Sequence, residues 1–243
     1  LAERLLIVMR VYFEKPRTVL GWKGMINDPD LDETFGINRG LRLARTLLND
    51  IANIGLGAGT EFLDTTLGQF YADLISWGAI GARTAENRTD GNIQVAIDAI
   101  RSARHRHLFP SLTKDGAPAI LETAGNPYCH LVLRGGTETG PNYSAASVAR
   151  AIDRLRQSQL AESIMIDCSH GNSEKVPDRQ RDVAADVKRQ IDDGNAAIRA
   201  LMVESHLNPG RQDLGESLDY GVSVTDACLG FDETAELLRR FAD

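Results

Sequence analysis

The chain has 243 residues, of which 42% are hydrophobic, and this favours a single α/β domain with one substantial core over two smaller domains. The formal net charge of −7 argues against a surface that binds nucleic acid or an anionic membrane. No apolar run approaches the roughly 20 residues of a membrane helix. Three cysteines, Cys129, Cys168 and Cys228, are an odd and sparse set, typical of reduced thiols in a cytoplasmic protein rather than of a disulfide framework.

The first stretch of the chain, residues 5–13, is apolar except for Arg10. Such a run is typical of a strand buried on both faces of a parallel sheet. Arg10, Lys15 and Arg17 then gather positive charge at the carboxyl end of this predicted strand. Buried charge is unfavourable unless it is paired. These residues therefore either pair with nearby carboxylates or bind an anionic ligand.

The rest of the chain alternates between helical and extended segments. Apolar residues at helical spacing predict helices over residues 37–54, 69–77, 93–103 and 144–157, within 176–194, and over 233–242. Short apolar runs predict strands over residues 61–64, 78–83, 130–133, 164–166 and 198–203, with 55–59 as a helix-breaking turn. Residues 107–113 and 119–123 are expected to pair as a hairpin.

Polar side chains follow these apolar runs at or just beyond the predicted strand ends. They are Arg10, Asp64, Arg83, Arg134, His170 and Glu204. Strands that alternate with helices form parallel sheets with right-handed crossovers. The first strand is not followed by a glycine-rich fingerprint, which disfavours a dinucleotide-binding fold. Many strands that each deliver a polar group to one rim indicate a (β/α)8 TIM barrel. We therefore predict one barrel domain over residues 1–243, with an extra β-hairpin at about 107–123.

Several sequence blocks resemble the class I (microbial, type I-alpha) 3-deoxy-D-arabino-heptulosonate 7-phosphate (DAHP) synthases. MRVYFEKPRT and GWKGMINDPD are followed in the family's order by GTEFLDT, SWGAIGARTAE, HLVLRGG, IMIDCSHGNSEK, MVESHL and YGVSVTDACLG. The resemblance covers nearly the whole chain. It implies the condensation of phosphoenolpyruvate with D-erythrose 4-phosphate to DAHP and phosphate. This reaction is the first step of the shikimate pathway of aromatic amino acid biosynthesis.

The resemblance also implies roles for the basic residues. Phosphoenolpyruvate would be held by Arg10, Glu61, Arg83 and Arg134. Guanidinium groups bind phosphate and carboxylate in fork geometry, although a single arginine can equally be a solvated ion pair. Erythrose 4-phosphate would be held by the segment Lys15, Pro16, Arg17 and Thr18. The expected catalytic residues are Lys15, which would donate a proton to the developing alkoxide, and His170.

A second group combines one imidazole with two carboxylates: His170, Glu204 and Asp226. This donor set suits one divalent ion such as Mn²⁺, Fe²⁺, Co²⁺ or Zn²⁺ and does not choose between them. The resemblance implies that all three bind the metal, with a cysteine of the first barrel strand as the fourth ligand. Cys168 lies two residues before His170, on the same face of the strand. The family carries a non-ligand at this position, so we expect Cys168 to pack in the core.

The sequence also departs from the family's pattern. The first strand, which carries the cysteine ligand, is missing, so we expect the chain to be incomplete at its amino terminus. Between Glu86 and Asn87 the family has a helix and a fifth strand that ends in an active-site lysine. We expect these two residues to lie beyond bonding distance. An alternative interpretation is a catalytically silent barrel paralogue that serves as a ligand-binding or regulatory subunit.

Other expectations concern the chemistry and the partners. An aldolase that uses a Schiff-base lysine is disfavoured, because no lysine ends an apolar run in the manner that such a site needs. Members of the family are commonly inhibited by an aromatic amino acid bound near the predicted hairpin. We expect a homodimer or homotetramer that binds its small substrates, with no nucleic acid or membrane partner.

Overall fold

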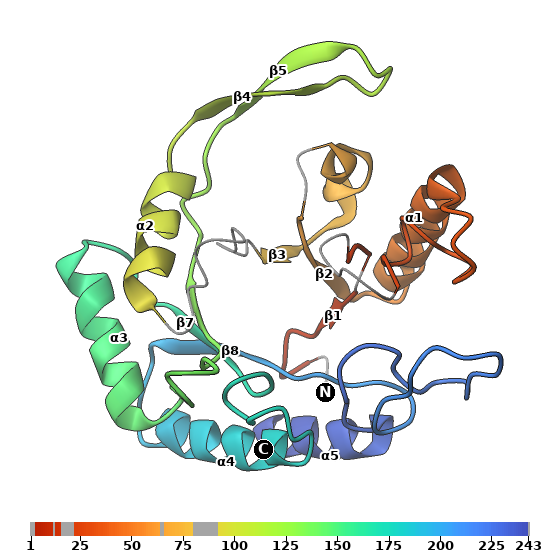
Figure 1. The fold of residues 1–243 in the computed structure, drawn as a ribbon. Helices are drawn as coiled ribbons and strands as arrows, with labels where there is room; N and C mark the ends of the chain where they lie inside the picture. Colours follow the sequence, from red (N-terminus) through yellow and green to blue (C-terminus); the bar gives the residue numbers. More distant parts are fainter. Residues whose placement is uncertain (1–2, 12, 16–21, 64–65, 80–91, 243) are drawn as a thin grey trace. The chain divides into compact units, whose positions relative to one another are not determined.

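The computed structural model describes residues 3–11, 13–15, 22–63, 66–79 and 92–242. The chain divides into two compact units, which we describe separately (Figure 1). The amino-terminal unit comprises Ala2–Gly81 and His107–Thr123, and the carboxyl-terminal unit comprises Ala82–Arg106 and Ala124–Asp243. Several predictions lie outside the described residues: those for Pro16, Arg17, Thr18, Asp64 and Arg83, and for the join between Glu86 and Asn87.

The amino-terminal unit is built on a parallel sheet with the strand order β1-β2-β3. These strands are β1 (Val8–Arg10), β2 (Gly57–Glu61) and β3 (Trp77–Ala79), and helix α1 (Ile37–Asn53) connects the first two. The 3₁₀ turns η1 (Leu67–Phe70) and η2 (Ala72–Leu74) connect β2 to β3. α1 is amphipathic and buries Ala44, Leu48 and Ile51. At Gly40, an added Cβ would lie 2.1 Å from the carbonyl oxygen of Ile26, so only glycine permits this close approach.

Two predictions for the first sheet are wrong in detail. β1 is a three-residue edge strand among the described residues, and its flank is open, with Leu6 92% and Met9 44% exposed, so it is not buried on both faces. The second strand covers Gly57–Glu61 and not 61–64. Its glycines allow neighbouring side chains to lie close: a Cβ at Gly59 would lie 3.2 Å from Val8 and 3.3 Å from Trp77. The helix does break where predicted, in a turn at residues 54–55 with Gly55 at φ 80°, but Gly57 and Gly59 belong to the strand and serve its close packing.

The predicted helix at 69–77 is also wrong, because this stretch contains the two short 3₁₀ turns and ends at Trp77, where β3 begins. Tyr71 lies between them and is fully buried, and its hydroxyl donates to Glu14 Oε1 at 2.7 Å. Phe13 packs edge-on against the Tyr71 ring, with a centroid separation of 5.4 Å. The apolar residues at helical spacing had indicated a helix here. In the structure the chain instead turns twice around Tyr71 and buries its side chain.

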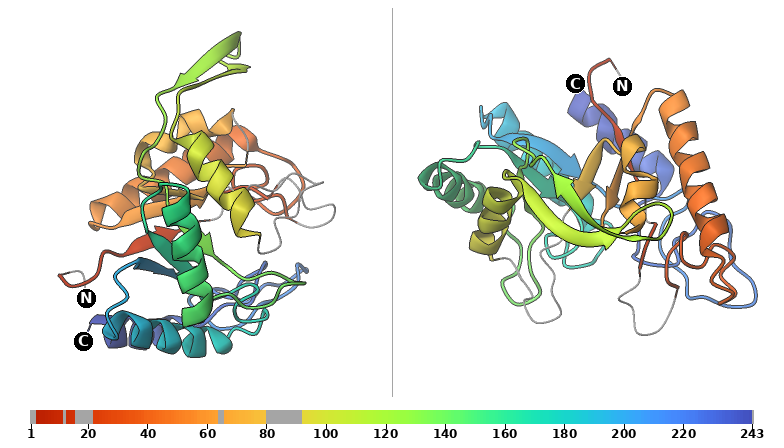
Figure 2. Two further views of the ribbon diagram at one scale, coloured as in Figure 1. Left: turned by 90° about the vertical axis from the view of Figure 1, so that its left-hand side faces the viewer. Right: turned by 90° about the horizontal axis from the view of Figure 1, so that it is seen from above.

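An antiparallel hairpin also belongs to the amino-terminal unit. β4 (His107–Leu112) pairs with β5 (Pro118–Thr123) in register from His107–Thr123 to Leu112–Pro118 (Figure 2). The side-chain amide of Gln69 in η1 donates to the Leu112 carbonyl at 3.0 Å and links the hairpin to its unit.

The carboxyl-terminal unit contains a second parallel sheet with the order β6-β7-β8. The strands are β6 (Leu131–Leu133), β7 (Ile164–Asp167) and β8 (Ile198–Met202), and the helices are α2 (Ile93–Ala103), α3 (Ala145–Gln157), α4 (Arg179–Asp192) and α5 (Phe231–Ala242). All four β7 residues are buried. Ile164 and Ile166 belong to one core cluster with Leu133 and Val148. α4 and α5 lie side by side, and Arg181 of α4 pairs with Glu233 of α5 at 3.2 Å (Figures 1 and 2).

The α/β class with parallel strands is therefore confirmed, and closure of these strands into one barrel stays a prediction. Within the part of the chain that the structure describes, no helix combines the length and the apolar character needed to cross a membrane.

Candidate metal centre

Three side chains of the carboxyl-terminal unit place their donor atoms together. One ligand atom from each of His170, Glu204 and Asp226 lies within 4.8 Å of the others. His170 follows β7, Glu204 follows β8, and Asp226 lies on the long loop between β8 and α5. His170 Nε2 is 3.4 Å from Glu204 Oε1. Parallel strands end at the same edge of a sheet, and this is why residues from distant parts of the sequence meet here.

His170 is held by the chain just before it. Its backbone is left-handed, with φ of 50°, and its ring Nδ1 lies 2.7 Å from Asp167 Oδ2 and 2.8 Å from Ser169 Oγ. Burial raises the pKa of the Asp167 carboxyl. The hydrogen bond and charge of His170, the Ser169 amide and the charge of Arg134 outweigh this and hold that pKa below its ordinary value. Asp167 is thus an ionised acceptor beside the imidazole.

Glu204 is held through its main chain. Its N–H donates to Gln180 Oε1 at 2.8 Å, and Gln180 Nε2 donates to the Glu204 carbonyl at 3.2 Å. Gln180 lies in α4 and is fully buried. The Leu229 N–H also donates to the Glu204 carbonyl, at 3.0 Å, and this bond ties the loop that carries Asp226 to the end of β8. The Glu204 side chain is buried, whereas that of Asp226 is exposed.

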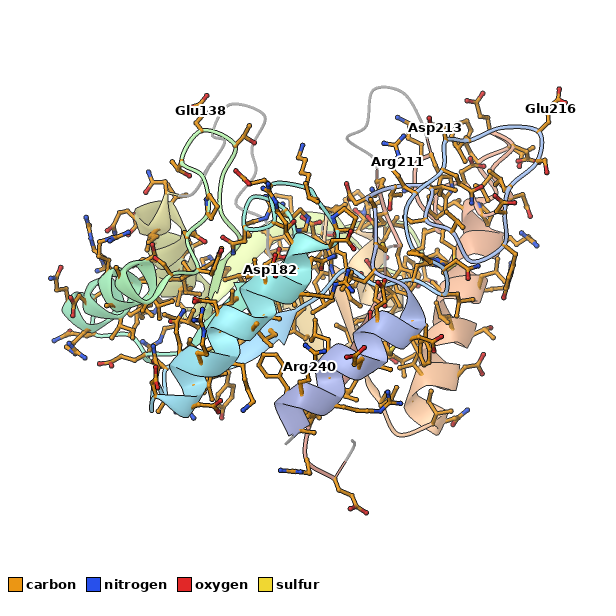
Figure 3. All side chains as sticks on the ribbon, turned by 90° about the horizontal axis from the view of Figure 1, so that it is seen from below. Glu138, Asp182, Arg211, Asp213, Glu216 and Arg240 are labelled. Atoms are coloured by element: carbon orange, nitrogen blue, oxygen red, sulfur yellow. The ribbon has the colours of Figure 1, made fainter. Side chains whose placement is uncertain are left out.

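Arg134 directly follows β6, and its loop contacts the loop that carries His170. An added Cβ at Gly135 would lie 2.6 Å from the carbonyl carbon of Gly171, so the two backbones touch. Asn172 joins them: its Nδ2 donates to the carbonyls of Leu133 at 3.0 Å and Asp167 at 2.7 Å. The Arg134 carbonyl accepts from the Asn172 N–H at 3.2 Å. Figure 3 shows Glu138 at the tip of the loop that follows β6.

The residues present fit a divalent metal ion. A neutral imidazole nitrogen and two carboxylates match the ligands of first-row divalent metals. Nδ1 of His170 is occupied by its contact with Asp167 Oδ2, so Nε2 is the ring nitrogen that faces Glu204. Cys168 is not a member of this group; its thiol is buried, and burial raises its pKa above the ordinary value.

The other predicted site residues described by the structure belong to the amino-terminal unit. Arg10 is the last residue of β1, and Glu61 is the last residue of β2. Arg10 lies at the strand end as predicted, whereas Glu61, predicted to begin a strand at 61–64, is instead the last residue of its strand. The main-chain N–H of Lys15 donates to the Lys23 carbonyl at 2.7 Å, on either side of residues 16–21.

Three residues of the site went unrecognised in the sequence: Asp167, Asn172 and Gln180. Asp167 could have been identified from the sequence, because an aspartate at a strand end can reach the ring of a histidine three residues later. Gln180 carried none, since only the tertiary fold brings this helical residue to the main chain of Glu204, 24 positions later.

Comparisons with known proteins agree with the sequence blocks. A family model described as the DAHP synthetase I family matches residues 1–239. The chain is 53% identical to the Phe-sensitive phospho-2-dehydro-3-deoxyheptonate aldolase of Escherichia coli (strain K12), over 100% of this chain and 75% of that protein. It is 51% identical to the Trp-sensitive enzyme of Buchnera aphidicola subsp. Schizaphis graminum, over 99% of this chain and 74% of that protein. The solved phospho-2-dehydro-3-deoxyheptonate aldolase from Francisella tularensis SCHU S4 matches with a TM-score of 0.90 and 48% identity, over 97% of this chain and 74% of that one.

Proposed function

This chain belongs to the DAHP synthetase I family, and we propose that its reaction depends on a divalent metal ion held by His170, Glu204 and Asp226. The reaction is DAHP synthesis, the condensation of phosphoenolpyruvate with erythrose 4-phosphate with release of phosphate. The observation that supports the metal site is the meeting of one imidazole and two carboxylates within 4.8 Å. Mn²⁺, Fe²⁺, Co²⁺ and Zn²⁺ all suit this donor set.

When bound, such an ion supplies Lewis acidity toward the aldehyde oxygen. The chain's own residues prepare the site for it. Glu204 and Asp226 contribute negative charge, and His170 contributes its Nε2, because its Nδ1 is occupied by the contact with Asp167. Since Glu204 is buried and bound at its main chain to the buried Gln180, the backbone that carries this carboxylate is held in place.

We assign phosphoenolpyruvate to Arg10, Glu61, Arg83 and Arg134. Arg134 supports this assignment, because its loop is hydrogen-bonded to the loop of the candidate metal ligand His170. Erythrose 4-phosphate is assigned to Lys15, Pro16, Arg17 and Thr18. In this arrangement Lys15 gives a proton to the alkoxide that forms as the new carbon–carbon bond closes. Fixed cations also stabilise the developing charge and hold the reacting carbons in line.

The proposal extends to the fold: one (β/α)8 barrel over the whole chain, with its first and fifth strands absent from this sequence. Two three-stranded parallel sheets with helical crossovers support it. The alignment with the E. coli relative spans 263 positions, 20 more than the chain has residues, so that relative contains segments with no counterpart here. β1 is an edge strand among the described residues, with exposed apolar neighbours, as expected of a strand that lacks a partner.

The similarity to these relatives also supports proposals on regulation and assembly. The relatives' names describe Phe-sensitive and Trp-sensitive enzymes, and we propose that an aromatic amino acid inhibits this chain too, near the β4–β5 hairpin. We propose a homodimer or homotetramer in the cytoplasm, where the three free cysteines would stay reduced.

A catalytically silent paralogue is not favoured, because the complete group of three candidate ligands keeps its geometry. The deciding experiment is turnover of the purified protein with both substrates and added Mn²⁺, followed as phosphate release. Release that requires both substrates is expected. Tight phosphoenolpyruvate binding without any turnover would favour the silent alternative.

A further inference from the structure

We infer that Asp167 is a positioning residue that sets the tautomer of His170 and so makes Nε2, rather than Nδ1, the atom available to a metal ion. This inference rests on the proposed metal centre. It adds Asp167 to the three candidate ligands as a residue that acts through its hydrogen bond to His170 Nδ1.

The contacts of Asp167 leave its carboxylate no freedom. The side chain is 3% exposed and lies at the end of β7. Its Oδ1 accepts from the Ser169 N–H at 2.9 Å, and its Oδ2 lies 2.7 Å from His170 Nδ1. An ionised carboxylate has no proton to donate, so the short contact to Nδ1 requires a proton on that ring nitrogen. The neutral ring then has its lone pair on Nε2.

The Ser169 hydroxyl cannot make this selection alone. Its Oγ lies 2.8 Å from Nδ1, but a hydroxyl both donates and accepts and therefore suits either tautomer. Asp167 differs because it accepts only, is buried, and is fixed by a main-chain N–H. Ser169→Ala is therefore a matched control that removes a contact to the same nitrogen and leaves the acceptor in place.

The tautomer matters because of what faces the other nitrogen. Nε2 lies 3.4 Å from Glu204 Oε1. A proton on Nε2 would point into the region between His170 and Glu204 and would block a metal ion there. A lone pair on Nε2 lets the imidazole, Glu204 and Asp226 share one ion.

The test substitution is Asp167→Asn, which keeps the shape of the side chain. An amide has one oxygen, so it can satisfy either the Ser169 N–H or the His170 Nδ1–H, but not both. If the oxygen stays with Ser169, the amide NH₂ faces Nδ1 and drives the ring proton to Nε2. We therefore expect the metal-free variant to populate the Nε2–H form, whereas the wild type holds the Nδ1–H form.

The first readout is long-range ¹H–¹⁵N NMR of the histidine rings in metal-free protein at about pH 8, above the ordinary histidine pKa. His170 is assigned by comparison with His170→Gln. His206 is an internal reference, since its Nδ1 contacts the Gly221 carbonyl and should not respond to Asp167. Thermal unfolding and circular dichroism check that the variant is folded. An amide oxygen turned toward Nδ1 would keep the Nδ1–H form in Asp167→Asn, so Asp167→Leu, which has no acceptor at this position, is measured beside it. An Nδ1–H form of His170 that persists in both variants would overturn the inference.

The second readout is Mn²⁺ affinity from competition with a chelating dye. Loss of a residue that orients a metal-binding histidine typically costs roughly 10- to 100-fold in affinity. We expect that loss for Asp167→Asn and less than about threefold for Ser169→Ala. If the wild type binds Mn²⁺ and Asp167→Asn binds it equally well, Asp167 has no positioning role and the proposed function is unaffected. If the wild type and His170→Gln bind Mn²⁺ alike, the metal centre itself is wrong, whatever the tautomer.

Discussion

The carboxamide of Gln180 pairs with the main chain of Glu204 through two hydrogen bonds, at 2.8 Å and 3.2 Å. A side chain on α4 thereby takes the place of a neighbouring strand just beyond the end of β8. The bond pair fixes the backbone from which the Glu204 carboxylate projects toward His170.

Replacing Gln180 with Met should weaken metal binding by roughly tenfold or more, because Glu204 loses its fixed backbone. The buried N–H of Glu204 would also lose its partner, which costs about 1–3 kcal/mol of the free energy of unfolding. Gln190→Met is the matched control. Gln190 is also a buried glutamine of α4, and it donates to the Tyr143 carbonyl at 2.8 Å. The control should be destabilised with unchanged Mn²⁺ affinity, and equal affinity in both variants would exclude a positioning role for Gln180.

Asn172→Ala should raise the KM for phosphoenolpyruvate by about tenfold or more, since it cuts the hydrogen bonds that join the Arg134 loop to the end of β7. Asn172 Nδ2 holds the Leu133 and Asp167 carbonyls, and its Oδ1 accepts from the Asn142 N–H at 2.8 Å. Steady-state kinetics and urea unfolding would measure both effects. A variant that is destabilised but has an unchanged KM would show that the link between the loops is purely structural.

Cys168→Ala should keep its Mn²⁺ affinity within about threefold, because the thiol is buried in the core and lies outside the group of candidate ligands. In the native wild type, Cys168 should also react much more slowly with a thiol reagent than the partly exposed Cys129, since burial raises the Cys168 pKa and restricts access. Mass spectrometry of the labelled peptides reads this out. Loss of metal in Cys168→Ala would identify the thiol as a ligand.

Arg134 and Lys15 should fail in different ways. Arg134→Ala should mainly raise the KM for phosphoenolpyruvate, because it removes a cation that binds the substrate's anionic groups before and during reaction. Lys15→Met should mainly lower kcat, because its proton is needed only as the alkoxide forms. Arg154→Ala, an exposed arginine of α3, serves as the control. Reversed phenotypes would mean that the two substrates are assigned to the wrong residues.

Much of the fold could be predicted from apolar periodicity. The spacing of apolar residues correctly predicts several regular segments. They are the helices at 93–103 and 144–157 and the strands near 131–133 and 164–167. β2 was misplaced because its glycines, which serve close packing against Val8 and Trp77, look like a turn when read locally. The exposure of β1 could not be predicted, since it depends on which strands pair with it.

The three candidate ligands could be named from the sequence because each belongs to a block that resembles a known family. The residues that hold them in place could not all be found in this way. Asp167 is close to His170 in sequence, but Gln180 reaches Glu204 only through the packing of α4 against the end of β8. Contacts of this kind leave no periodic or motif signal in one sequence.

The most direct test of metal-dependent DAHP synthesis is to remove the metal and restore it. Purified protein is treated exhaustively with a chelator and dialysed, and phosphate release from phosphoenolpyruvate and erythrose 4-phosphate is measured as Mn²⁺ is added back, alongside the bound metal. We predict loss of turnover on chelation and recovery in step with one bound ion per chain, with no recovery in His170→Ala. Undiminished turnover in the fully metal-free protein would contradict the proposed function of this site.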